Sequence, residues 1–186
     1  HFKPVNTTET PSMQTIRVIS VGACSHVKQH CAILTVVSVL KEKDYHVEYF
    51  HLGTGELEKS ETNLARDLKI EENVHFVGNQ KNVLPWLYKA DFFLMSSLYE
   101  GLGNSCAEAM SAGLIPIVND VPGLRDLVKH EKNGLVLDFN NPTKVADKII
   151  ELSKDADRMK VFSINSRKKI EQNYSLLNVN DLIAEY

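Results

Sequence analysis

The chain has 186 residues, of which 43% are hydrophobic and 24% are charged, and its formal net charge is −3. This length predicts one domain, and the charge gives no support for nucleic acid as the main partner, because such proteins usually carry a basic face. No apolar run approaches the roughly 18–20 residues that a membrane-spanning helix needs.

The chain contains three cysteines, Cys24, Cys31 and Cys106, with no C-x-x-C spacing. An odd number of cysteines without a metal-like or disulfide-like pattern favours unpaired thiols in a reducing compartment. Residues 1–13 are polar and contain two prolines, which does not fit a secretory signal. We therefore expect a cytoplasmic protein, with peripheral attachment to the cytoplasmic face of the membrane left open.

The order of hydrophobic segments predicts an α/β domain. Residues 1–14 lack periodicity and are interpreted as an interdomain linker, and residues 15–173 as the folded domain. The expected strands are residues 15–21, 46–52, 74–77, 91–95, 115–118 and 134–137. The expected helices are residues 27–43, 56–68, 83–89, 143–153 and 157–173. This alternation predicts a Rossmann-like parallel sheet flanked by helices, with ligands at the carboxyl ends of the strands.

The most informative motif holds two carboxylates, Glu100 and Glu108, separated by seven residues. It follows the strand at residues 91–95, contains Gly101 and Gly103, and continues into small and apolar residues at helical spacing. This pattern predicts a strand, a glycine turn and a helix, with Glu108 about one turn inside the helix. The free N–H groups at the start of that helix form an anion site, and carboxylates accept bonds from hydroxyls. A sugar joined to a nucleotide through phosphates fits this combination.

The chain resembles the C-terminal, nucleotide-sugar-binding half of retaining glycosyltransferases with the GT-B fold, in the family usually numbered four. The match around the two glutamates consists of Leu98, Tyr99, Glu100, Gly101, Glu108, Ala109, Met110 and Gly113. Further matches follow in the expected order at Val21-Gly22, Ser25, Lys28, Gly53-Thr54-Gly55, residues 74–78, residues 115–120, Pro122-Gly123 and residues 133–136.

The resemblance implies roles for individual residues. Glu108 would hold the ribose hydroxyls, Glu100 a hydroxyl of the donor sugar, and Lys28 the diphosphate, so that Glu100 and Lys28 are the catalytic candidates. The other candidate substrate-binding residues are Gly22, Gly53, Asn82, Val83, Gly101, Leu102, Gly103, Asn104 and Ser105. The family usually has an arginine directly after Gly22, and this chain has Ala23 there, so one phosphate-binding cation is absent from its usual place.

Each of these residues also has a purely structural interpretation. Glu108 fits an exposed helix position, Glu100 a turn, and Lys28 the first turn of the helix expected at residues 27–43. The glycines could simply permit tight turns.

The function implied by the resemblance is donor binding in a retaining, metal-independent glycosyltransferase of glycan or polysaccharide biosynthesis. The donor would be a UDP-, GDP- or ADP-sugar, the acceptor a saccharide or a lipid-linked saccharide, and no cofactor is expected. Residues 174–186 resemble a helix that crosses back to an N-terminal acceptor domain. We expect that domain to be missing from this chain, so the chain should be inactive alone. The alternatives are a non-catalytic nucleotide-sugar-binding module and a GT-B sugar-nucleotide epimerase.

Other functional motifs are not supported. The sequence contains no G-x-G-x-x-G after its first strand and no G-x-x-x-x-G-K-[ST], which argues against a dinucleotide oxidoreductase and a P-loop nucleotidase. His26 and His30 are four residues apart with Cys31 adjacent, but no third ligand stands at a familiar spacing. No metal site is therefore expected.

Overall fold

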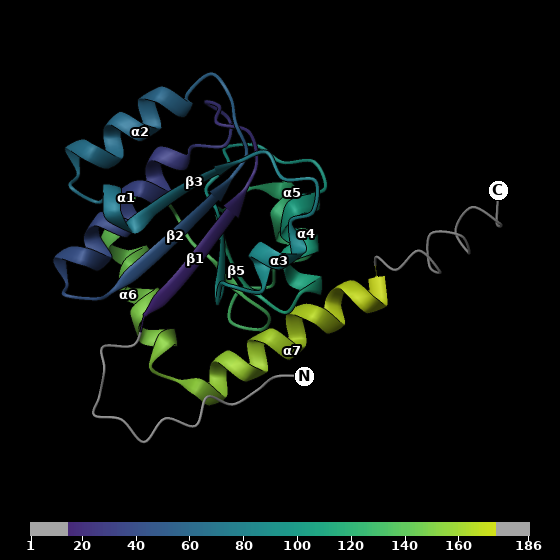
Figure 1. Cartoon of the computed structure of the whole chain (residues 1–186). Coiled ribbons are helices and arrows are strands. Elements are labelled where there is room, and N and C mark those ends of the chain that lie inside the picture. Colours follow the sequence, from purple (N-terminus) through teal and green to yellow (C-terminus); the bar gives the residue numbers. More distant parts are fainter. Residues whose placement is uncertain (1–14, 174–186) are drawn as a thin grey trace, which may run out of the picture.

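The computed structural model describes residues 15–173, which form a six-stranded sheet (Figure 1). The expected linker at residues 1–14 and the expected helix at residues 174–186 lie outside the described residues. Every neighbouring pair of strands is parallel, in the order β3-β2-β1-β4-β5-β6. The strands are β1 Ile16–Val21, β2 Val47–Leu52, β3 Val74–Gly78, β4 Phe92–Met95, β5 Ile115–Val118 and β6 Leu135–Val136. The expected Rossmann-like α/β fold is confirmed.

Helices cover both faces of this sheet (Figure 1). The helices are α1 His30–Glu42, α2 Glu58–Asp67, η1 Glu71–Asn73, α3 Leu84–Leu87, α4 Asn104–Ser111, α5 Pro122–Leu127, α6 Pro142–Ser153 and α7 Ala156–Asn173. One core cluster contains buried residues of α1, α2 and α6, and the other contains those of α3, α4 and α5. Among residues 15–173, no helix combines the length and apolar character needed to cross a bilayer.

The alternation of side chains along β4 explains the two clusters. Phe92 and Leu94 lie in the cluster with α1 and α6, whereas Phe93 and Met95 lie in the cluster with α4 and α5. All four side chains are buried. Successive strand residues point to opposite faces, so a run of four apolar residues marks a central strand covered on both sides.

Two helix predictions need correction. The helix expected at residues 27–43 begins only at His30, because Gln29 has a left-handed backbone with φ 53°. Lys28 therefore lies in the loop between β1 and α1, not in a helical first turn. The segment beginning at Pro122 forms α5, although no helix was expected there, and its proline occupies the first turn, where a missing N–H costs nothing.

The sheet order reverses direction between β1 and β4, and the loops after these two strands are joined by hydrogen bonds. Buried Ser96 Oγ donates to the backbone oxygens of Lys28 at 2.9 Å and of Gln29 at 2.7 Å. The Leu98 N–H donates to the Val27 oxygen at 2.8 Å. Such a reversal is where α/β sheets bind ligands.

A cluster of four polar side chains is buried beneath the loop that follows β1: Cys24, His30, His51 and Glu61. Burial, together with the nearby His30, lowers the pKa of His51 to about 4, and the ring is therefore neutral near pH 7. Burial and the neighbouring Glu61 carboxylate raise the pKa of the Cys24 thiol to about 12. No local pattern in the sequence indicates this cluster.

Candidate functional site

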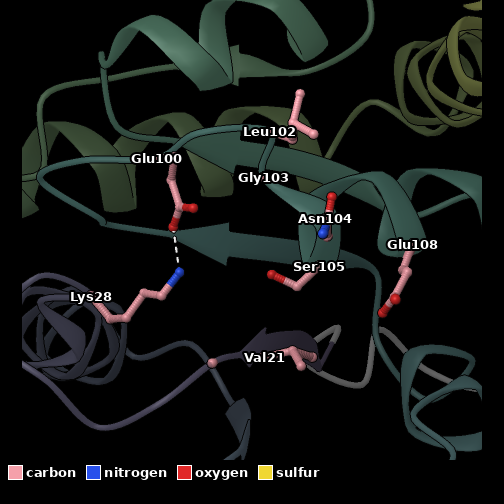
Figure 2. A pocket seen from close by; sticks show the side chains of 9 residues that line it. Val21, Lys28, Glu100, Leu102, Gly103, Asn104, Ser105 and Glu108 are labelled. Carbon is pink, nitrogen blue, oxygen red and sulfur yellow. Dashed lines mark hydrogen bonds and ion pairs between the residues drawn. The ribbon is translucent and has the colours of Figure 1, made fainter. Parts of the chain in front are cut away.

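A pocket of about 400 Å³ opens at the reversal of the strand order, between the loops that follow β1 and β4 (Figure 2). Its lining residues are Val21, Gly22, Lys28, Glu100, Leu102, Gly103, Asn104, Ser105 and Glu108. Eight of these nine are candidate site residues from the sequence. Val21 was matched there only as the end of the first strand, although its place directly before Gly22 was a usable signal for the site.

Lys28 and Glu100 meet across the pocket. Lys28 Nζ donates to Glu100 Oε1 at 2.5 Å, and Ser97 Oγ donates to the same oxygen at 2.7 Å. The side chain of Lys28 is 26% exposed and that of Glu100 only 10% exposed. Both bonds therefore use one carboxylate oxygen. Within residues 15–173, Oε2 is left available to accept a bond from a ligand hydroxyl.

The N-terminus of α4 forms the middle of the pocket wall (Figure 2). Gly103 precedes the helix in a left-handed conformation with φ 62°, and no side chain caps the helix. The first helical bond runs from the Ala107 N–H to the Gly103 oxygen at 3.0 Å. The N–H groups of Asn104 and Ser105 precede that bond and can bind an anion, which the helix dipole also favours.

Glycine is needed at position 103 for steric reasons as well. A Cβ atom there would lie 2.9 Å from Leu124 Cδ2 and 3.1 Å from Leu127 Cδ1. A side chain at this position would displace the ends of these two leucines, so its absence favours close packing of the start of α4 against α5. The same packing fixes where the free N–H groups are directed.

Glu108 lies at the opposite end of the pocket from Glu100, with Asn104 and Ser105 between them (Figure 2). It is the fifth residue of α4 and is exposed, so the predicted position one turn into a helix is confirmed. Cys106 on the same helix is fully buried, and burial, with the Glu100 charge as a smaller cause, raises the pKa of its thiol. The wall thus presents carboxylate, N–H groups and carboxylate in sequence.

Four candidate residues lie outside this set of lining residues. Gly53 instead supports Gly22, since a Cβ atom at Gly53 would fall 1.9 Å from the Gly22 oxygen. Asn82 Oδ1 accepts from the Leu84 N–H at 3.1 Å near the start of α3, and Val83 packs against the core. Gly101 is exposed. Their proposed contacts with the nucleotide remain predictions.

His26, His30 and Cys31, the set considered above as metal ligands, lie in different surroundings. His30 is buried and faces Glu61, whereas His26 and Cys31 are exposed. His26 also lies in the loop before α1, so it does not share a helical face with His30.

Residues 7–169 match the family model for glycosyl transferases group 1. A relative from Haemophilus influenzae, described as an uncharacterized glycosyltransferase, is 35% identical over 128 residues, which cover 67% of this chain and 35% of the relative. The chain spans about a third of the length of this and the next curated relatives.

Two solved structures share the fold. A crystal structure of a Staphylococcus aureus TarM mutant, in complex with fondaparinux, alpha-GlcNAc-glycerol and UDP, has a TM-score of 0.85 at 23% identity. The alignment covers 96% of this chain and 37% of that one. The C-terminal domain of a glycosyl transferase group 1 family protein, LpcC from Francisella tularensis, has a TM-score of 0.76 at 16% identity, with coverage of 86% and 87%.

Proposed function

This chain belongs to the glycosyl transferases group 1 family, and we propose that it is the domain that binds the nucleotide-sugar donor of a retaining glycosyltransferase. The acceptor would be a saccharide or a lipid-linked saccharide, and the reaction a step of glycan or polysaccharide synthesis. The observation that carries this proposal is the one pocket that brings together Lys28, Glu100, the free N–H groups of α4 and Glu108.

The donor would lie along this wall from one carboxylate to the other. Its ribose would bond to Glu108, its diphosphate to Lys28 and the N–H groups of Asn104 and Ser105, and its sugar to Glu100. The order of the groups along the donor matches the order of the residues along the pocket. The diphosphate lies between the ribose and the sugar, and the N-terminus of α4 lies between the two glutamates (Figure 2). The free Oε2 of Glu100 would accept the sugar hydroxyl while Oε1 keeps its bonds to Lys28 and Ser97.

In the proposed reaction, the bond between the anomeric carbon and the diphosphate oxygen breaks, and the nucleoside diphosphate leaves with the bonding electrons. The acceptor oxygen then forms a bond to the same carbon from the same face, and its proton passes to the leaving diphosphate. Negative charge grows on the diphosphate as it leaves. Lys28 and the α4 N-terminus would stabilise that charge without a divalent cation, since both already present positive charge at this point.

UDP is the first ligand to test, because the TarM structure with the same fold contains UDP. Isothermal calorimetry with UDP, uridine and UDP-sugars should give measurable binding of UDP. Lys28→Ala should weaken UDP tenfold or more, about 1.4 kcal/mol, and leave uridine nearly unchanged, because only UDP carries the diphosphate. Lys160→Ala, an exposed lysine on α7, is the matched control.

A second comparison distinguishes the proposed roles of Glu100 and Glu108. Glu108→Ala should weaken UDP and UDP-sugar alike, by about 1–3 kcal/mol, because it removes bonds to a shared ribose. Glu100→Ala should weaken the UDP-sugar more than UDP. Glu71→Ala, on the remote and exposed η1, should change neither. Equal losses of both ligands in Glu100→Ala would contradict the placement of the sugar.

Transfer of sugar should require more than this chain. An acceptor held across a cleft supplies much of the rate through orientation, and closure excludes water from the activated sugar. We therefore expect residues 1–186 to bind donor but to show little transfer until an acceptor-binding domain is supplied. Robust transfer by this chain alone would refute that expectation. Release of an altered free sugar without acceptor would instead indicate an epimerase. Donor binding without turnover, even with an acceptor-binding domain supplied, would indicate a non-catalytic module.

A further inference from the structure

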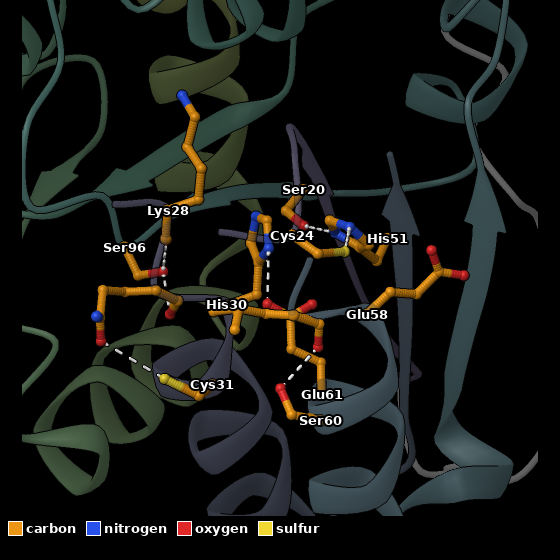
Figure 3. A network of polar contacts seen from close by, with 12 residues as sticks. Ser20, Cys24, Lys28, His30, Cys31, His51, Glu58, Ser60, Glu61 and Ser96 are labelled. Carbon is orange, nitrogen blue, oxygen red and sulfur yellow. Dashed lines mark hydrogen bonds and ion pairs between the residues drawn. The ribbon is translucent and has the colours of Figure 1, made fainter. Parts of the chain in front are cut away.

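We propose that Cys24, His30, His51 and Glu61 form a structural zinc site beneath the loop between β1 and α1 (Figure 3). The four residues come from four different elements: the loop after β1, the start of α1, β2 and α2. One ligand atom from each, a thiol sulfur, two ring nitrogens and a carboxylate oxygen, lies within 4.8 Å of all the others. Zinc takes four such ligands in a tetrahedral arrangement.

The distances within the cluster fit zinc. A tetrahedral zinc ion with ordinary bond lengths separates its ligand atoms by about 3.3–3.6 Å. Cys24 Sγ lies 3.2 Å from His51 Nε2, and His30 Nδ1 lies 3.4 Å from Glu61 Oε1. Two opposite edges of the tetrahedron are thus already formed, and a contraction of the remaining contacts from at most 4.8 Å would complete it.

The cluster leaves polar atoms that a cation would satisfy. Cys24, His30, His51 and Glu61 are all at most 4% exposed. Within residues 15–173, His30 Nδ1 and Glu61 Oε2 are buried without a hydrogen-bond partner. Such atoms are rare in folded proteins because each one loses its bonds to water. A cation at this point would accept the nitrogen lone pair and offset the buried carboxylate.

The surroundings of His51 match those of a metal-binding histidine. His51 Nδ1 lies 2.9 Å from Ser20 Oγ, which in turn lies 2.7 Å from the hydroxyl of Tyr49, a fully buried residue. A hydrogen bond at one ring nitrogen fixes the ring and leaves the other nitrogen directed at the metal. Here that other nitrogen, Nε2, faces Cys24 Sγ.

The charge and the access route are also suitable. Zinc bound to a thiolate, a carboxylate and two neutral imidazoles gives a site with no net charge, which lowers the cost of burial. Binding releases the Cys24 thiol proton to the solvent.

His30 and Glu61 also line a second cavity, of about 220 Å³, whose rim includes the exposed residues His26 and Cys31. This cavity gives a metal ion a path to the cluster. The site does not depend on the proposed function, because none of its ligands lines the donor pocket.

The test uses the full chain, freed of metal by a chelator and then titrated with Co²⁺ and Zn²⁺ alone. We expect one Co²⁺ per chain, with the visible absorption of a tetrahedral ion and a near-ultraviolet thiolate-to-cobalt band, both removed by one equivalent of Zn²⁺. Zn²⁺ should also raise the midpoint of thermal unfolding, because it binds the folded state. A wild-type chain that binds no stoichiometric Co²⁺ would show that the cluster is a metal-free polar network and overturn the proposal.

Variants then test the assignment of the ligands. Cys24→Ser should abolish the thiolate band, and Glu61→Gln, which keeps the size of the side chain, should weaken Co²⁺ at least tenfold while the metal-free protein stays folded by circular dichroism. The matched control is Cys31→Ser, at the exposed neighbouring cysteine, which should leave the spectrum unchanged. A thiolate band that survives Cys24→Ser, or disappears in Cys31→Ser, would place the metal at another site and refute the assignment.

Discussion

The ion pair between Lys28 and Glu100 should stabilise the ligand-free fold measurably, and a double-mutant cycle can isolate that contribution. Replacing Lys28 with Met removes the charge and keeps most of the stem, and replacing Glu100 with Gln keeps an oxygen that Ser97 can reach. The coupling between Lys28→Met and Glu100→Gln then reports the charged part of the contact.

The expected size follows from distance and burial. The atoms Nζ and Oε1 are 2.5 Å apart, and the side chains are 26% and 10% exposed. Hydrogen bonds to charged groups contribute about 1.5–3 kcal/mol, whereas exposed ion pairs contribute about 0–1 kcal/mol. Because Lys28 is a quarter exposed and Glu100 is nearly buried, we expect a coupling of about 1–2 kcal/mol.

Urea unfolding of the four proteins of the cycle, without ligand, measures this coupling. The control is the same cycle on Lys43, which directly follows α1, and Asp147 of α6. These two residues form an ion pair with atoms 3.0 Å apart and side chains 37% and 56% exposed. That pair should show a coupling below about 0.5 kcal/mol. If the two cycles give the same small coupling energy, the pocket ion pair behaves as a contact between two solvated groups, and the argument from burial is wrong.

Three further predictions concern the loops and the thiols. Gly103→Ala should lower the free energy of unfolding by about 2–4 kcal/mol in urea denaturation, because a left-handed alanine is strained and its Cβ would meet Leu124; an unchanged midpoint would contradict the close packing. Ser96→Ala should cost about 1–2 kcal/mol in the same assay, because the partly buried carbonyls of Lys28 and Gln29 lose the donor that buried Ser96 supplies. Ser96→Thr should recover part of that loss. A thiol reagent at pH 8 should modify Cys31 rapidly and Cys106 only after unfolding, because burial both shields the Cys106 thiol and raises its pKa; rapid labelling that persists in Cys31→Ser would refute this.

The strand segments could be located along the chain because each central strand is an apolar run between turn residues. Their order within the sheet was not predicted. β4, with four buried residues, and β5 are of this kind. The start of α1 was placed three residues early because Val27 and Lys28 continue the helical spacing, while the left-handed backbone of Gln29 leaves no trace in the pattern. α5 was missed because Pro122 and Gly123 resemble a turn.

The site was largely predictable because two local segments carry it. Lys28 follows one strand, and the two glutamates bracket the helix after another, so parallel strands bring them together at one edge. The direct contact between Lys28 and Glu100, 72 residues apart, could not be derived from spacing. For the same reason, the buried cluster could not be predicted from local sequence patterns. His51 and Glu61 reach Cys24 only through the pairing of β2 with β1 and the packing of α2.

The charges of the pocket have a consequence for the speed of binding. Lys28 contributes +1, and Glu100 and Glu108 contribute −1 each, so the formal charge of the lining residues is −1 on a chain whose own net charge is −3. An approaching anion is therefore not steered from a distance, and its attraction arises only within the last few ångström, at Nζ and the helix N–H groups. The association rate constant should stay near the unsteered range of about 10⁵–10⁶ M⁻¹s⁻¹ and change little with ionic strength. Differences in affinity among anionic ligands should therefore arise from their dissociation rates.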